Sequence, residues 1–226
     1  MQYPPHFIIV RIAVLVVGLA WGVFELADGL AEHAETDLDH RIVLSLRQPE
    51  NLQRMIGPAA FEESMRDFTA LGGYAVLITT VVGFSVFAWA ELGAHAFRFF
   101  ALSSIGGFFA GMLMKQLVRR DRPSMVPHLS HVSGHTSFPS SHALMSVVVY
   151  VTAGFLLAEL TQNRRLRHLL VGLPFLLALL VGISRVCMGV HYPTDVLAGW
   201  TGGLVWTWCA FAIRGRLSRQ KNVVAE

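Results

Sequence analysis

Charged residues are scarce in this chain, and their scarcity argues against a large soluble domain. Only 15% of the 226 residues are charged, whereas 54% are apolar, and the mean hydropathy is +0.52. This composition favours a small bundle of helices in a membrane. The chain also lacks internal repeats and low-complexity tracts. Its formal net charge is +3, but no basic stripe with interleaved aromatic residues accompanies it, so we expect no nucleic-acid partner.

Cysteine is also rare, which excludes a disulfide framework. Cys209 lies in an apolar run and is expected to be a packing residue. Cys187 lies between Arg185 and His191, which leaves a catalytic thiol as an alternative. No sequence feature activates this thiol, and a histidine nucleophile is already available nearby.

Six apolar runs are long enough, or nearly so, to cross a bilayer, which takes roughly 20 residues per helix. They cover about 7–26, 71–89, 97–114, 142–160, 169–183 and 196–213. They predict an all-α, polytopic membrane helix bundle of about six transmembrane helices, with residues 1–226 forming one integral-membrane domain. A cleavable signal is the alternative for the first run, although no clear small-residue cleavage site follows it.

The longest connection, residues 27–70, mixes Asp, Glu and Arg with Leu and Phe. This mixture is typical of amphipathic helix lying at a membrane interface. We expect this connection on the outer face.

Basic residues outside the motifs predict the orientation. They crowd the 161–168 loop and the C-terminus, namely Arg164, Arg165, Arg167, Arg214, Arg216, Arg219 and Lys221. The positive-inside rule puts both segments in the cytoplasm, together with the N-terminus. Arg41, Arg47, Arg54 and Arg66 in the long connection weaken this bias. The polar segments 115–142 and 184–195 then lie on the outer side of the cytoplasmic (inner) membrane.

The first polar island contains Lys115, Arg122 and Pro123. A helix from Lys115 to Arg122 would put both cations on one face, about two turns apart, where they can converge on one anion. The alternative is an ordinary basic membrane flank that reaches for lipid headgroups. Arg119 and Arg120 fit that flank better.

The second island is Pro139-Ser140-Ser141-His142, directly before an apolar run. Ser140 is predicted to cap the next helix, whose first amides would face an anion. Simple helix capping is the alternative. His142 favours function, because an imidazole at the membrane edge is costly. Ser133-Gly134-His135 is a similar segment seven residues earlier, but no helix is expected to follow it.

The third island joins Ser184-Arg185 to His191 and Asp195. Pro193 suits the first position of a helix, so Asp195 falls in its first turn and His191 just outside it. A carboxylate bonded to one imidazole nitrogen leaves the other free as a nucleophile. Taken alone, Asp195 could simply favour the positive end of the helix dipole.

These three islands resemble the KxxxxxxRP, PSGH and SRxxxxxHxxxD signature of the type-2 phosphatidic acid phosphatase superfamily, integral-membrane branch. The resemblance implies that His191 is the nucleophile, Asp195 orients it and His142 is the general acid. It implies phosphate binding by Lys115, Arg122, Arg185, Ser140 and Ser141, and no metal or other cofactor. Ser141 replaces the glycine of the signature, which affects the shape of the amide cradle.

The leading hypothesis is a membrane lipid phosphatase that uses a phosphohistidine. Compatible substrates are isoprenyl diphosphate, phosphatidic acid, phosphatidylglycerol phosphate and lipid A, with isoprenyl diphosphate favoured. A lipid phosphotransferase is the alternative, and an anion channel or carrier has less support. His128, His131 and His135 suggest a metal site, but no carboxylate or thiolate cluster accompanies them. The oligomeric state stays open.

Overall fold

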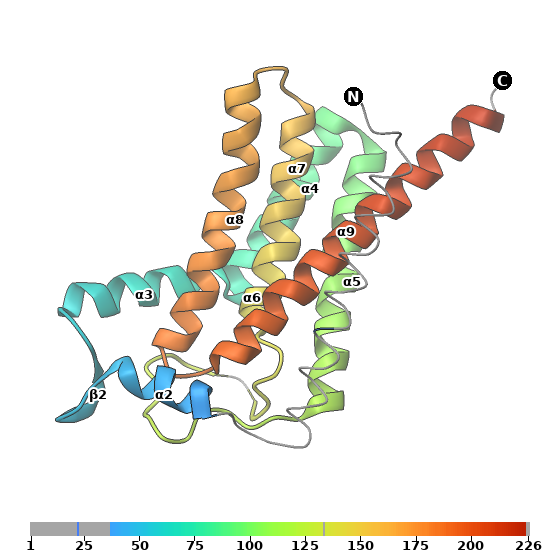
Figure 1. Cartoon of the computed structure of the whole chain (residues 1–226). Coiled ribbons are helices and arrows are strands. Elements are labelled where there is room, and N and C mark those ends of the chain that lie inside the picture. Colours follow the sequence, from blue (N-terminus) through green and yellow to red (C-terminus); the bar gives the residue numbers. More distant parts are fainter. Residues whose placement is uncertain (1–21, 23–36, 133, 225–226) are drawn as a thin grey trace, which may run out of the picture.

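Five helices long and apolar enough to cross a membrane run through the part of the chain that the structure describes (Figure 1). This computed structural model describes residues 22, 37–132 and 134–224. Three of the five helices are α4 (Tyr74–Leu92), α5 (Ala94–Val118) and α8 (Arg164–Cys187). The first predicted span, about 7–26, lies outside the described residues except for Gly22.

The other two helices carry the second and third motifs at their starts. One is a continuous helix made of α6 (Ser141–Ser146), the π-helical turn η1 (Val147–Val151) and α7 (Thr152–Glu159). The other is α9 (Pro193–Val224). The predicted spans therefore differ from these helices mainly at their ends.

The connection before α4 is folded and contains more than helix. It consists of α2 (Asp37–Ser45), a hairpin of β1 (Arg47–Gln48) and β2 (Asn51–Met55), and α3 (Ala59–Leu71). We expected only amphipathic helix here, so the hairpin was missed. Figure 1 shows α3 lying crosswise to the long helices and projecting to one side of the bundle from its contact with α8. Its position at a membrane interface stays a prediction.

The helix made of α6, η1 and α7 forms the centre of the bundle. Val148, Val149 and Leu156 on it are fully buried and belong to the largest apolar cluster among the described residues. The hydroxyl of Tyr150 donates a hydrogen bond of 2.5 Å to the carbonyl of Leu71 at the end of α3. This contact ties the central helix to the connection before α4.

Two glycines on one face of α9 let it approach α6 closely. A Cβ atom on Gly199 would lie 2.7 Å from the carbonyl oxygen of Ser140, and one on Gly203 would lie 2.8 Å from that of Leu144. Small residues at this spacing are typical of tightly packed membrane helices. The close approach brings the start of α6 against the start of α9, where the second and third motifs lie.

The two ends of the bundle differ in character. The α5–α6 and α8–α9 loops lie at the same end as α2, whereas the α7–α8 turn and the C-terminal end of α9 lie at the other (Figure 1). At that far end, Arg214 donates two hydrogen bonds to Glu159, of 2.6 and 2.9 Å. The three polar islands lie in or beside the α5–α6 and α8–α9 loops, so they gather at the end of the molecule opposite this ion pair.

Candidate active site

His191 lies buried between an acid and a cation. Its Nδ1 is 3.4 Å from Oδ2 of Asp195, and its Nε2 is 3.2 Å from Nη1 of Arg122. A guanidinium can only donate hydrogen bonds, so Nε2 must be the acceptor and Nδ1 carries the proton in the neutral ring. The lone pair of Nε2 therefore points to the cation, which is where an anionic substrate would bind.

The ring of His191 is held in its neutral form. Burial, together with the charges of Arg185, Arg122 and Lys115, lowers its pKa well below the usual value of 6.5. At neutral pH the imidazole is consequently unprotonated, as a nucleophile requires.

Asp195 is fixed in the first turn of α9, as the sequence predicted. The backbone N–H of Tyr192 donates a 2.9 Å hydrogen bond to its Oδ2. Its backbone carbonyl accepts a 3.0 Å hydrogen bond from the N–H of Ser140, which joins the third motif to the second. Oδ1 lies 2.7 Å from Nη1 of Arg120.

The predicted helix from Lys115 to Arg122 is wrong. Helix α5 ends at Val118, and Arg119 follows in the left-handed conformation with φ 50°. The chain then pairs with a segment of the same loop, since Ser137 donates a 2.7 Å hydrogen bond to the carbonyl of Arg120. Arg122 reaches His191 from a loop rather than from a helix face.

That loop is anchored by Lys115 and Arg122 themselves. Lys115 Nζ donates to the carbonyls of Thr136 and Ser137, at 3.1 and 3.3 Å. Arg122 donates through Nη1 to Val190 at 2.7 Å and through Nε to Gly134 at 3.1 Å. Backbone carbonyls of the α5–α6 loop, and the carbonyl of the residue before His191, therefore fix both cations in place.

Arg185, the third predicted phosphate binder, is buried near the C-terminal end of α8. Its Nη1 donates to the hydroxyl of Thr69 at 2.7 Å and lies 3.4 Å from that of Ser130. Its Nε has no hydrogen-bond partner among the described residues. A buried donor without an acceptor costs free energy unless a ligand or a water molecule pairs with it.

Ser140 caps α6 as predicted, with its hydroxyl accepting from the N–H of Ala143 at 3.5 Å. Ser141 and His142 follow as the first two residues of that helix. Their amides have no acceptor within the helix, because the first N–H groups of any helix lack one.

The structure separates the two candidate histidines. His142 lies in electrostatic range of Arg185, His191, Arg122 and Lys115, and its Cβ would be 3.1 Å from a Cβ atom on Gly72. His135 is exposed and lies in the loop before α6. Ser133, the first residue of the similar Ser133-Gly134-His135 segment, lies outside the described residues.

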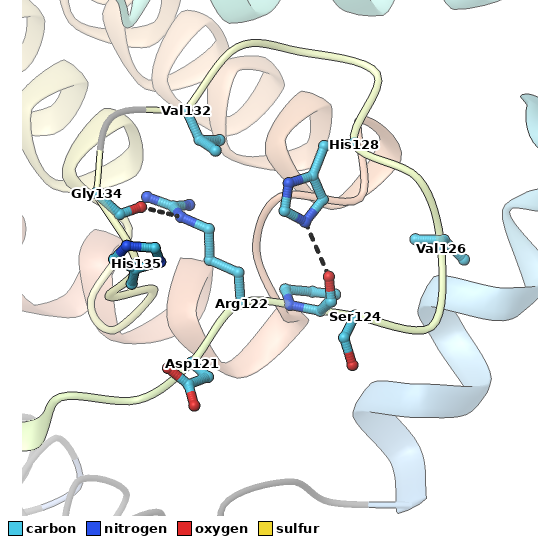
Figure 2. A pocket seen from close by; sticks show the side chains of 9 residues that line it. Asp121, Arg122, Ser124, Val126, His128, Val132, Gly134 and His135 are labelled. Atoms are coloured by element: carbon cyan, nitrogen blue, oxygen red, sulfur yellow. Dashed lines mark hydrogen bonds between the residues drawn. The ribbon is translucent and has the colours of Figure 1, made fainter.

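A pocket of about 700 Å³ opens beside Arg122. Figure 2 shows His128, His135, Val132 and the Gly134 carbonyl around the Arg122 side chain. Arg122 therefore contacts His191 and also lines this pocket. His128 Nε2 lies 2.8 Å from the carbonyl of Pro123. In the part of the chain that the structure describes, no group of three or more His, Cys, Asp or Glu side chains is arranged to hold a metal.

Several contacting residues were missed by the sequence reasoning. The assignment of Arg120 to a basic membrane flank is wrong, because its side chain is buried against Asp39 and Asp195. Asp39, Thr69 and Ser130 stand in segments without a motif. The only sequence signal for Arg120 was its position two residues before Arg122.

Residues 94–219, more than half of the chain, match the PAP2 superfamily. The chain belongs to this superfamily. The resemblance identified from the three islands is thereby confirmed. The matched region contains all three motifs but not α2, the hairpin or α3.

Three curated proteins are similar to this chain over part of their length. It is 37% identical to phosphatidylglycerophosphatase B of Bacillus subtilis over 41% of this chain and 45% of that protein. It is 36% identical to a decaprenylphosphoryl-5-phosphoribose phosphatase of Mycolicibacterium smegmatis over 50% and 52% of the two chains. It is 39% identical to an undecaprenyl-diphosphatase of Sulfolobus acidocaldarius over 33% and 31%. The matches thus span about half or less of each relative's length.

A crystal structure extends the similarity to nearly the whole chain. The transmembrane PAP2 type phosphatidylglycerolphosphate phosphatase from Bacillus subtilis superposes with a TM-score of 0.77 at 26% identity, covering 89% of this chain and 96% of that one. Aquifex aeolicus LpxE shares the fold, with a TM-score of 0.52 at 21% identity over 76% and 90% of the two chains. The prediction of an all-helical, multi-pass membrane fold is confirmed.

Proposed function

We propose that this protein is a membrane lipid phosphatase that works through a phosphohistidine on His191, without a metal. One observation carries the proposal. His191 directs its Nε2 at Arg122 while its Nδ1 faces the Asp195 carboxylate. A neutral, oriented nucleophile beside a cation is what attack on a phosphate requires.

In the first step, the substrate phosphate is held by Lys115, Arg122 and Arg185 and by the amides at the start of α6. Nε2 of His191 attacks phosphorus in line, and the bond from phosphorus to the lipid oxygen breaks. His142 gives a proton to that oxygen. The Asp195 carboxylate stabilises the positive charge that develops on the imidazole.

In the second step, water attacks the phosphohistidine and His142 takes a proton from it. The bond from phosphorus to nitrogen breaks, and orthophosphate leaves. The three fixed cations supply the charge that a metal ion provides in other phosphatases.

The substrate class is a membrane lipid with a terminal phosphate or diphosphate. The names of the relatives support this class, since they include a phosphatidylglycerophosphatase, an undecaprenyl-diphosphatase and a phosphatase of decaprenylphosphoryl-5-phosphoribose. The proposed location is the outer side of the cytoplasmic membrane. The start of α8, which contains Arg164, Arg165 and Arg167, lies at the opposite end of the bundle from the motifs (Figure 1).

Phosphate release by the purified protein in detergent tests the proposal. The substrates are isoprenyl diphosphate, phosphatidic acid and phosphatidylglycerol phosphate, in excess chelator and without an acceptor lipid. We expect release for at least one of them, and a loss of at least ~10³-fold in the His191→Ala variant. His168→Ala, which changes an exposed histidine near the start of α8, is the matched control and keeps full activity.

Two outcomes contradict this function. Transfer of the phosphate to an added acceptor lipid, with no release of orthophosphate, indicates a phosphotransferase. Release that is lost in chelator and restored by zinc indicates a metal enzyme built on the loop histidines.

A further inference from the structure

The Arg120 side chain lies buried between two acids. Its Nη1 donates to Oδ1 of Asp195 at 2.7 Å, and its Nη2 donates to Oδ2 of Asp39 at 2.8 Å. All three side chains are at most 1% exposed. A buried guanidinium with both terminal nitrogens engaged has little freedom to turn.

Thr194 and Tyr192 also belong to this cluster. The Thr194 hydroxyl accepts from Arg120 at 2.7 Å and donates to Asp39 at 2.6 Å. The Thr194 amide donates to the other oxygen of Asp39 at 3.1 Å. The guanidinium carbon lies 4.1 Å from the centre of the Tyr192 ring. The start of α9 is therefore fixed to α2 through Asp39.

The charges of the cluster matter for His191. Among these three side chains, one guanidinium is shared between two carboxylates. Oδ1 of Asp195 is occupied by Arg120, so Oδ2 is the oxygen presented to Nδ1 of His191. If Arg120 paired with Asp195 alone, it would offset more of the Asp195 charge, and less of that charge would stabilise the imidazolium formed on attack.

Asp39 comes from a segment that the family match does not include. It stands on α2, whereas the matched region begins at residue 94. Other residues of the same connection also reach the site. Arg47 donates to the carbonyl of Cys187 at 2.7 Å, just before the turn that leads to His191, and Thr69 accepts from Arg185. The connection thus supports the catalytic centre directly.

We propose that Asp39 and Arg120 are positioning residues for the reaction: together they orient Asp195 and keep the negative charge beside His191 during phosphohistidine formation. This inference rests on the proposed function. Neither side chain touches the substrate. Both act through Asp195.

The test compares Asp39→Asn and Arg120→Lys with the wild-type protein in detergent. Asparagine keeps the shape of Asp39 and removes its charge, whereas lysine keeps the charge of Arg120 and removes the fork that binds two acids at once. Asp37→Asn is the matched control, because it makes the same change on the same helix at a side chain that is 98% exposed.

The readouts are kcat per active site and KM, with active sites counted as folded protein in the monodisperse peak of size-exclusion chromatography. We expect kcat to fall about 10–100-fold in both variants with KM nearly unchanged, as for other residues that orient a catalytic group. The control keeps wild-type kcat. A merely structural role would reduce the number of active sites and leave kcat per site unchanged.

Wild-type kcat per site in Asp39→Asn, or a raised KM with unchanged kcat, overturns the proposal. If Asp39→Asn does not yield folded protein, Arg120→Lys decides by the same criteria. The proposed function fails in a different way, since the wild-type protein itself would then release no phosphate.

Discussion

At the residue scale, the central feature is a histidine whose two nitrogens are distinguished by their neighbours. Arg122 can only donate and Asp195 can only accept when ionised, so the proton of His191 lies on Nδ1. Burial and three nearby cations keep the ring neutral. Their charge also favours an anion in front of Nε2, so the proposed mechanism uses one arrangement for both substrate binding and attack.

His142→Ala provides a test of the general acid. We expect turnover of a lipid phosphate to fall about 10²–10⁴-fold, because an alkoxide leaving group needs a proton. Turnover of p-nitrophenyl phosphate should fall far less, since its leaving group is already stable as an anion. Parallel rates of phosphate release from the two substrates measure this difference.

His135→Ala is the matched comparison, and we expect it to leave both rates unchanged. The opposite result, an inactive His135→Ala beside an active His142→Ala, assigns the acid to the exposed loop histidine instead.

The residues of the site were predictable from sequence to different degrees. His191, Asp195 and the capping Ser140 follow from local rules, because Pro193 and the serine mark helix starts close to the residues that they position. Asp39 and Thr69 were not predictable. Each acts through a contact across the fold, to Arg120 and Arg185 respectively, and such contacts leave no local pattern.

At the element scale, the approach of α9 to α6 assembles the site. Gly199 and Gly203 remove the side chains that would separate these helices, and Ser140 then donates to the backbone of Asp195. The loop after α5 is the element that sequence reasoning misjudged. The spacing of Lys115 and Arg122 suggested a continued helix, but the chain leaves the helix at Val118, where Arg119 is left-handed and Asp121 pairs with Thr136.

Gly203→Ala tests the helix contact. Its Cβ would lie 2.8 Å from the Leu144 carbonyl and 2.9 Å from Cβ of Val147, so we expect a loss of about 1–3 kcal/mol from overpacking. The unfolding midpoint in detergent should fall by several degrees. Gly83→Ala on α4 is the control, since nothing lies within 4 Å of its added Cβ. Equal midpoints for the two variants contradict the role of this contact.

At the scale of the whole molecule, the bundle has one reactive end and one basic end. The motif loops and α2 lie at the first, and the turn that begins α8 lies at the second (Figure 1). The positive-inside rule assigns the basic end to the cytoplasm. We therefore expect the reactive end to meet lipids of the outer leaflet.

Single cysteines test this orientation in a background that lacks Cys187 and Cys209. Ser124→Cys lies in the exposed α5–α6 loop, and Gln162→Cys lies in the exposed turn before α8. With a membrane-impermeant thiol reagent on intact cells, we expect labelling at 124 only. Labelling at 162 only would mean that the protein has the opposite orientation in the membrane and that its substrate lies in the cytoplasmic leaflet.

The most direct test of the account is the capture of the covalent intermediate. The protein is mixed with a lipid whose terminal phosphate carries ³²P, denatured in alkali within one turnover and digested. We expect the label on the peptide that contains His191, stable in alkali and lost in acid, and absent from the His191→Ala variant. Rapid phosphate release with no covalent label, or a label on another residue, contradicts the role of His191 as the nucleophile.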